Sequence, residues 1–288
     1  MTDQLTDSLL RSRSTSPTVS RAASPNRSPV KASRRLCCVD ESRRCRDGGA
    51  VKRPAHLGPS APAPSSFAGF RFPPEVILLA VRWYLRYGLS YRDVQELLAE
   101  RGIAVDHVTL LRWVHRFTPL LIDAARPGRH LPGDRWFVDE TYVKVAGVWR
   151  YVYRAVDQHG QVIDVYVSNH RDVASARTFF TAALTAHGEP AEVITDRAPA
   201  LANVIDDLLP GALHTTVQYE NNRVECDHGR LKARLRPMRG LKTNQTARVV
   251  IRGHAFVQNV RRGHYELGTD TTPALRLATA FDDLRIAL

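Results

Sequence analysis

Three acidic residues occupy positions that call for a chemical explanation. Asp139 lies inside RWFVDETYVKV, an apolar and β-branched run over 135–145. An uncompensated carboxylate is costly to bury, so an aspartate that faces inward from a strand needs a partner cation, a hydrogen-bond cage or a chemical role. Asp196 closes the strand-like run AEVIT, and Glu225 lies within the helical pattern of YENNRVECDHGRLK.

Grouped together, the three acids would form a site for divalent cations. Carboxylates held close together repel strongly, so such a cluster is destabilising unless divalent cations occupy it. Oxygen-only ligands select Mg²⁺ or Mn²⁺. Two such ions can activate a water or a 3′-hydroxyl on one side of a phosphodiester and stabilise the leaving oxygen on the other. We therefore predict that Asp139, Asp196 and Glu225 hold two ions, Mg²⁺ or Mn²⁺, in a catalytic site.

Two of the acids have simpler explanations when each is taken alone. Asp196 precedes a helix, where aspartate is a good N-cap. Glu225 can form a surface ion pair with a nearby base such as Lys232. We favour the shared site because ligands gather at the carboxyl ends of strands in open α/β sheets, where Asp196 is expected.

Strand alternation separates Asp139 from its acidic neighbour Glu140. Asp139 shares a face of the strand with Phe137 and other apolar residues, whereas Glu140 shares the opposite face with Lys144. We therefore expect Asp139 to be the functional acid of the pair.

The elements that must position these acids follow a recognisable order. Strand patterns at 135–145, 148–157 and 162–170 are separated by the short turns AG and QHGQ, as in an antiparallel meander. Further elements follow: a helix over 172–187, a strand over 191–195, a helix opening at Ala198-Pro199, a strand-like run over 213–219, and helices over 221–235 and 244–262. The order predicts an α/β fold, a ribonuclease H-like (retroviral integrase-like) mixed sheet with flanking helices.

Three short helical patterns precede this sheet. The first covers 74–87; the second begins at the cap pair Ser90 and Asp93 and ends at Gly102. The third is capped by Asp106 and reads HVTLLRWVHRF, ending before Pro119. Three helices with a tight glycine-containing turn between the last two are typical of an all-α helix-turn-helix.

The third helix would then enter the major groove of DNA. The candidate contacts near its start are His107, Thr109 and Arg112. The alternative is a small helical bundle used for packing or dimerisation.

The charge of the chain favours a polyanionic partner. The net charge is +12 and the pI about 10.0, and surplus Lys and Arg gain affinity by displacing counterions from phosphates. Residues 1–65 carry 12 of the basic and five of the acidic residues and are rich in Ser, Arg and Pro, which predicts disorder. This extension is an organellar transit peptide, a nucleic-acid-binding tail or translated upstream sequence without function, and we favour the last two.

A membrane location is not expected. The longest apolar run, VILLAV at 76–81, is far too short to span a bilayer, and no signal-peptide core follows Met1. The four cysteines lack the paired spacing of a zinc site or a disulfide framework, which favours a reducing cytoplasm. We therefore expect a cytoplasmic protein.

The region around Glu225 is strongly basic. Residues 223–262 contain eleven Lys and Arg and only two acids, which suits a phosphate-lined channel beside the acidic site. The candidate DNA contacts in this region are His228, Arg230, Lys232 and Arg234. The alternative is a solvated helix face.

Several motifs in order resemble the DDE-type insertion-sequence transposases of the IS-six family. The motifs are FPPEVILLAVRWYLRYGLSYRDVQELLAERGI, WFVDETYVKVAGVWRYVYRAVDQHG, VITDRAPA and NNRVECDHGRLK, and the resemblance runs from about Phe70 to Arg262. It implies a helix-turn-helix that recognises terminal inverted repeats, followed by an integrase-like catalytic domain. The DDE triad of the family would be Asp139, Asp196 and Glu225. The interval between Asp196 and Glu225 is shorter than in the family pattern.

The resemblance implies metal-dependent cleavage that frees 3′-hydroxyls, then direct transesterification into target DNA by a replicative route. Composition and the order of elements divide the chain into an extension (1–65), a helix-turn-helix domain (66–127), a catalytic domain (128–265) and a C-terminal tail (266–288). The partners would be double-stranded DNA, both element ends and target, and a second copy of the chain in a homodimer or higher oligomer. Two alternatives stay open: an inactive remnant that only binds DNA, and a structure-specific nuclease on the same fold.

Overall fold

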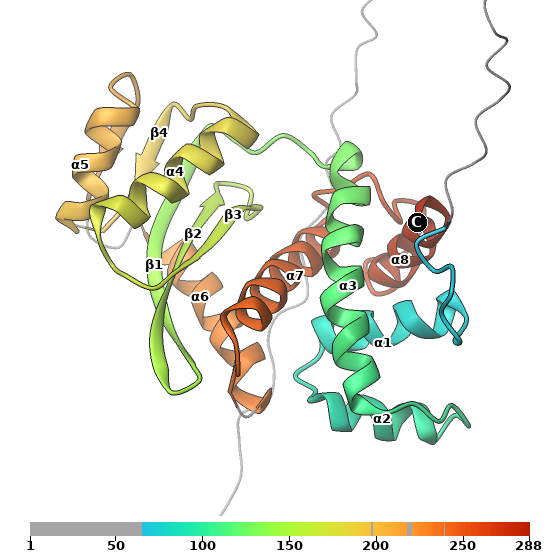
Figure 1. Ribbon diagram of the computed structural model, residues 1–288. Helices are drawn as coiled ribbons and strands as arrows, with labels where there is room; N and C mark the ends of the chain where they lie inside the picture. Colours follow the sequence, from blue (N-terminus) through green and yellow to red (C-terminus); the bar gives the residue numbers. More distant parts are fainter. Residues whose placement is uncertain (1–64, 197, 218–220, 239) are drawn as a thin grey trace, which may run out of the picture. The chain divides into compact units, whose positions relative to one another are not determined.

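The computed structural model describes residues 65–196, 198–217, 221–238 and 240–288 (Figure 1). The predicted disorder of residues 1–65 concerns residues outside these ranges, apart from Ser65. Arg239 of the basic region also lies outside them.

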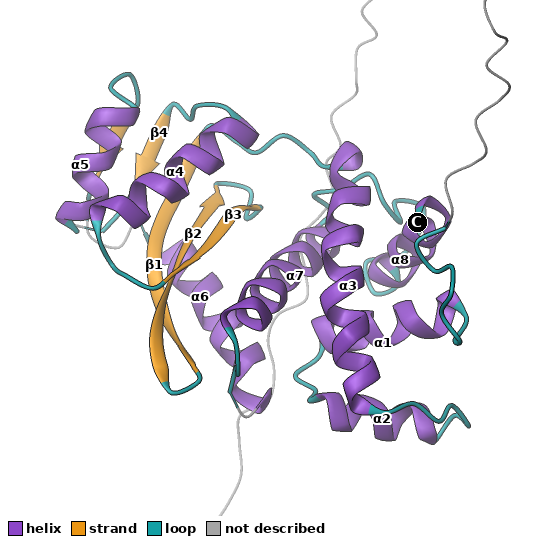
Figure 2. Ribbon diagram, viewed as in Figure 1, coloured by secondary structure: helices purple, strands orange, loops and turns teal. Residues whose placement is uncertain are grey.

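A five-stranded mixed sheet positions the acids (Figure 2). The strands are β1 (Arg135–Val145), β2 (Val148–Asp157), β3 (Val162–Ser168), β4 (Glu192–Ile194) and β5 (Leu213–Thr215). Their order is β3-β2-β1-β4-β5; β1, β2 and β3 are antiparallel, β4 is parallel to β1, and β5 is parallel to β4. This arrangement confirms the predicted ribonuclease H-like fold, although β3, β4 and β5 end earlier than predicted.

The β1–β2 hairpin is closed by a two-residue turn that needs left-handed backbone. Ala146 has φ 50° and Gly147 has φ 83°. Turns of this kind match the right-handed twist of the flanking strands, and Gly at the second position removes most of the strain. The predicted AG turn is therefore confirmed.

Helices cover both faces of the sheet (Figure 1). One face, which includes Trp136 and Val138, packs against α4 (Val173–His187) and α5 (Pro199–Leu208). The other face, which includes Phe137, packs against α6 (Asn222–Leu235) and α7 (Asn244–Arg262). The predicted alternation along β1 is confirmed, and each buried aliphatic or aromatic side chain contributes about 1.5–3 kcal/mol.

A second core joins the other helices. It is built from α1 (Pro74–Arg86), α2 (Tyr91–Ala99), α3 (His107–Ala125), α8 (Arg276–Ala287) and part of α7. Two short 3₁₀ helices, Arg126–Gly128 and Arg236–Met238, follow α3 and α6. Residues 266–288, expected to form a tail, thus include a helix whose apolar face is buried in this core.

The ends of α2 and α3 test the predicted capping. Ser90 and Asp93 form a reciprocal capping box, and the Asp106 side chain accepts from the Val108 N–H, as the sequence indicated. The prediction that α3 ends before Pro119 was wrong, because the helix continues to Ala125. Proline removes one backbone hydrogen bond, but burial of Leu121 and Ala125 in the helical core stabilises the continued turns.

Among the described helices, none has both the length and the apolar character needed to cross a bilayer.

Candidate active site

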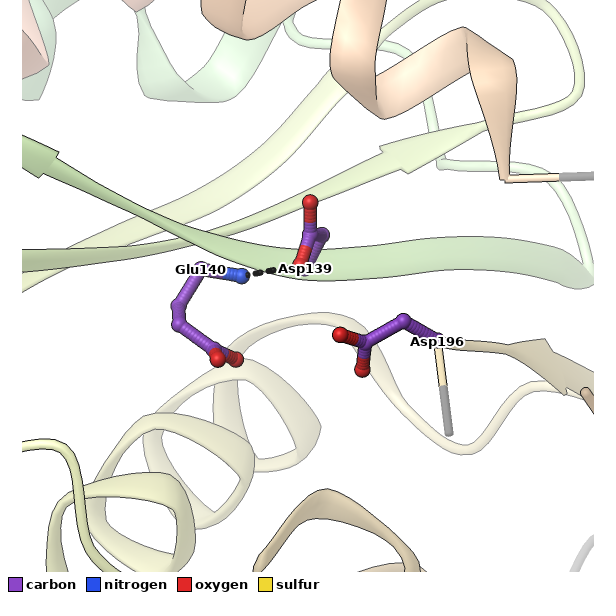
Figure 3. Close-up of side chains that lie close together, drawn as sticks. All are labelled: Asp139, Glu140 and Asp196. Carbon is purple, nitrogen blue, oxygen red and sulfur yellow. Dashed lines mark hydrogen bonds between the residues drawn. The ribbon is translucent and has the colours of Figure 1, made fainter. Parts of the chain in front are cut away.

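The register of β1 and β4 brings two predicted acids level with each other. The strands pair in parallel with Phe137 opposite Ile194, where β4 ends. Continuing that register by two residues sets Asp196 beside Asp139. One carboxylate oxygen from each of Asp139, Glu140 and Asp196 lies within 4.8 Å of the other two (Figure 3).

Asp139 lies in an environment that disfavours its ionised form. Burial, followed by the negative charges of Glu140 and Asp196, raises the pKa of Asp139 to about 7. One stabilising contact is the Glu140 backbone N–H, which donates to Asp139 Oδ1 at 2.8 Å. His228 Nδ1 lies 3.5 Å from Oδ2, but burial and Arg154 lower the pKa of His228 to about 4. At neutral pH the imidazole of His228 is therefore uncharged, so it does not compensate the negative charge of Asp139.

Glu140 and Arg171 were missed by the sequence-based prediction. The Glu140 side chain is buried on the α4 side, and its carboxylate contacts the Arg171 guanidinium, which also lies 4.0 Å from Asp196 Oδ2. Burial raises the pKa of Glu140 against the opposing effect of Arg171. The expectation that Asp139 is the functional acid of the pair stays a prediction, although Glu140 also lies in the acidic group.

The reason is the short length of β4. Because β4 pairs only with residues 135–137, the edge of β1 beside Asp139 and Glu140 has no neighbouring strand. Side chains from both faces can approach Asp196 at this open edge. The adjacent acids are visible in the sequence, but the short pairing that brings both of them near Asp196 is not.

Asp196 is not the N-cap of α5, because Ala198 holds that position and no side chain caps the helix. Asp196 Oδ1 accepts from the Ala198 backbone N–H at 3.0 Å, in the segment before α5. Its Oδ2 lies near Arg171.

Glu225 is placed differently from the two aspartates. It lies in the first turn of α6, exposed, and is not in the group defined by the 4.8 Å distances. Its charge nevertheless contributes to the raised pKa of Asp139. Among the described residues it forms no ion pair, and Lys232, its expected partner in the simpler explanation, instead holds Nζ 4.8 Å from the Tyr142 ring centroid.

The predicted basic contacts of α6 divide into buried and exposed residues. Arg230 is exposed, 3.9 Å from Asp227 Oδ1. His228 is buried against Asp139. Arg234 is also buried; its guanidinium donates to the Tyr84 carbonyl and stacks over the Tyr84 ring, so it joins α6 to α1 and is not a surface contact.

The predicted contacts at the start of α3 are accessible to different extents. Arg112 is exposed, while His107 and Thr109 are half-buried. His107 Nδ1 lies 3.0 Å from Asp106 Oδ1, and its backbone N–H donates to Gln95 Oε1 at 3.1 Å, which links α3 to α2.

A second buried carboxylate, Asp227, lies on α6 next to this site. It pairs with the fully buried Arg154, and Arg262 Nη2 donates to its Oδ1 at 3.0 Å. Burial alone would raise the pKa of Asp227, but Arg154 and Arg262 outweigh burial and hold that pKa below its usual range. This carboxylate is thus fully compensated.

Comparisons with known proteins agree with this geometry. Residues 133–264 match a family model described as a DDE domain. The transposase for insertion sequence-like element IS431mec of Staphylococcus aureus strain Mu50 is 41% identical to the chain over 169 residues, which cover 57% of the chain and 75% of the relative. The chain belongs to the DDE transposases of the IS-six family.

Two further comparisons concern a second transposase and the solved structure of an integrase domain. The transposase for insertion sequence element IS257 in transposon Tn4003 of Staphylococcus aureus is also 41% identical and equally covered. The HTLV-2 integrase catalytic core domain, in complex with magnesium, is 18% identical with a TM-score of 0.36, and the match covers 52% of this chain and 97% of that one.

Membership of the family establishes the activity. The chain is a DNA transposase, an enzyme that cleaves DNA strands and transfers them, and it uses divalent metal ions. The described acids suit such ions, because their ligand atoms are all oxygens and repel one another.

Proposed function

We propose that Asp139, Asp196 and Glu225 are the catalytic acids of this transposase and hold two Mg²⁺ ions, or Mn²⁺ in their place. The observation that carries the proposal is the close approach of Asp139 and Asp196, whose carboxylate oxygens lie with one of Glu140 within 4.8 Å of one another. The charge of Glu225 also contributes to the raised pKa of Asp139. When bound, such ions polarise the phosphodiester and neutralise charge on the attacking and leaving oxygens.

The protein residues have separate tasks in this proposal. Asp139, fixed by the Glu140 backbone N–H, sets the position of the site on β1. Asp196 turns one oxygen to the start of α5 and leaves the other for a ligand. Glu225 would complete the site from the first turn of α6, where a negative charge is favourable. Glu140 is held by Arg171, which neutralises it.

The proposal also includes the residues that recognise DNA. His107, Thr109 and Arg112 would read terminal inverted repeats from the start of α3, within a domain over 66–127. Exposed Arg230 and Lys232 would bind phosphates near the acids, within a catalytic domain over 128–265. His228 and Arg234 would support this surface from beneath it.

The assembly and location complete the proposal. Two DNA ends must be held together for transfer, so we expect a homodimer or higher oligomer on DNA. We expect the protein to act at the nucleoid in a prokaryotic cytoplasm.

The decisive experiment compares acids in a cleavage and joining assay. A donor DNA end and a target plasmid are incubated with the wild-type chain and with Asp139→Asn, Glu225→Gln and Glu140→Gln in Mg²⁺. Loss of a catalytic acid is expected to lower nicking by at least about 10³-fold while end binding is retained. Glu140→Gln is expected to keep most activity because Arg171 already neutralises that side chain.

Asp164→Asn is the matched control, because Asp164 is a half-buried acid on β3 at the far edge of the sheet. Equal loss in Glu140→Gln with full activity in Glu225→Gln would assign the third ligand to Glu140. Binding without chemistry in the wild type would identify an inactive remnant, and cleavage without joining a nuclease.

A further inference from the structure

The β1–β2 hairpin presents two aromatic rings to solvent. The Tyr142 and Trp149 side chains are 55% and 51% exposed, and their ring centroids lie 5.1 Å apart in an edge-to-face arrangement. Exposed aromatic rings that form a patch mark binding surfaces more often than isolated ones do. Both rings belong to the strands that flank the two-residue turn at Ala146 and Gly147.

Lysine side chains lie over both rings. Lys144 Nζ is 5.4 Å from the Trp149 ring centroid, and Lys232 Nζ is 4.8 Å from that of Tyr142. Among the described residues, neither lysine forms an ion pair with a carboxylate. Each ammonium therefore remains available for an anion while its ring orients it.

These side chains line a groove of about 400 Å³ between the hairpin and the C-terminal half of α6. We call it the hairpin groove; it is lined by Tyr142, Val143, Lys144, Trp149, Lys232, Leu235, Arg236, Gly240 and Leu241. Three of these residues are cationic and none is acidic. The charge of the groove is complementary to phosphate, while its walls offer aromatic and aliphatic surface.

The hairpin groove shares β1 and α6 with Asp139 and Glu225. β1 and α6 approach at Asp139 and His228, 3.5 Å apart, and again at Tyr142 and Lys232. Three residues of a strand span about 10 Å, and four residues of a helix span about 6 Å. Successive phosphates of one DNA strand are spaced by about 3.4 Å or more. If one phosphate of a strand lies at the acids, the base two or three nucleotides further along therefore lies at the groove.

We propose that the hairpin groove binds an unpaired nucleotide of the DNA strand that reacts at the acids. Tyr142 and Trp149 stack its base, and Lys144, Lys232 and Arg236 contact the flanking phosphates. A paired duplex offers its phosphates but not the face of a base, so the rings add affinity only for a strand that is locally unpaired. The proposal rests on the proposed function for the choice of DNA as the ligand.

Strand binding without metal tests this proposal independently of catalysis. The full chain is titrated in EDTA with a fluorescein-labelled oligothymidylate and, separately, with a labelled blunt duplex of unrelated sequence. Trp149→Ala is expected to weaken oligothymidylate binding about tenfold and to leave duplex binding within about twofold of the wild type. Trp149→Phe, which keeps a ring, is expected to restore most of the loss.

Val148→Ala is the matched control, because Val148 is 52% exposed on the same hairpin but does not line the groove. Equal weakening of duplex and single strand, or no weakening of either, would overturn the proposal. A change of oligomeric state in Trp149→Ala with unchanged single-strand affinity would also overturn it and assign the rings to a protein interface. EDTA removes the divalent ions that cleavage requires, so this test measures binding alone. Its result does not depend on whether the wild-type chain cleaves DNA.

Discussion

Two carboxylates of this transposase, the half-buried Asp139 on β1 and the buried Asp227 on α6, have opposite electrostatic environments. Asp227 is paired with Arg154 and Arg262, and its pKa is lowered. Asp139 is surrounded by other acids, and its pKa is raised to about 7. Both are largely excluded from water, so burial alone does not explain the difference.

Arg154 explains the difference. It is the register partner of Asp139 on β2, yet its guanidinium turns to Asp227 and to Gln258 Oε1, 2.7 Å away. The cation on the neighbouring strand is thus committed to Asp227, and the side chain that lies against Asp139 is a neutral histidine. A paired carboxylate supports the fold, whereas an uncompensated one creates a demand for a cation.

Removing Arg154 is expected to have the largest effect on stability. Arg154→Met removes the fully buried partner of Asp227 and leaves Arg262 and the exposed Arg230, and breaking a buried pair costs about 3–5 kcal/mol. Urea unfolding followed by circular dichroism measures this cost. Arg135→Met, which removes a half-exposed partner of Glu192, is the matched control and is expected to cost less than about 1 kcal/mol. Similar midpoints for the two variants would show that the Asp227 cluster is not a structural ion network.

The surroundings of Asp139 also show which features of the fold and of the site could be predicted from the sequence. Hydrophobic alternation predicted both faces of β1, and the Ser90 and Asp93 pair predicted the start of α2, because these signals are local. The strand pattern and the family motif pointed to Asp139 and Asp196. The early end of β4, which brings Glu140 to the same edge, depends on the distances between elements.

Arg171 and Arg234 show the same limit. Arg171 follows β3 yet contacts Glu140 on β1, and Arg234 crosses to a carbonyl of α1. Such contacts join residues distant in the chain, so no periodicity records them. A basic helix looks like a DNA surface whether its arginines point outward or, like Arg234, inward.

Neutralising Asp139 is expected to stabilise the metal-free protein. Its pKa is about 7 when folded and near 3.8 when unfolded, so the folded state binds the proton more tightly. The stability this provides is complete below the unfolded pKa and is lost as the pH rises through about 7. Asp139→Asn should therefore gain about 2 kcal/mol over the wild type in EDTA at pH 8 and almost nothing at pH 4.

Thermal unfolding at both pH values measures this difference. Asp227→Asn serves as the opposing variant, because removal of its charge should destabilise the protein at pH 8. If Asp139→Asn were destabilising at pH 8 in EDTA, a cation of the protein itself would have to compensate Asp139, and the contrast between the two carboxylates would fail.

Arg171 offers the smallest and most specific test of the contrast. Its guanidinium neutralises Glu140 and lies 4.0 Å from Asp196 Oδ2, so it competes for the negative charge that would attract a divalent ion. Because Arg171 is half-exposed, water screens much of its charge, and Arg171→Gln is expected to tighten Mn²⁺ binding only about threefold to tenfold. Electron paramagnetic resonance of free Mn²⁺ during titration gives the dissociation constant, and Arg177→Gln, an exposed arginine of α4 paired with Asp207, is the control. Weaker binding in Arg171→Gln would mean that Arg171 orients Glu140 as a ligand, and Glu140 would then belong among the metal-binding acids of β1.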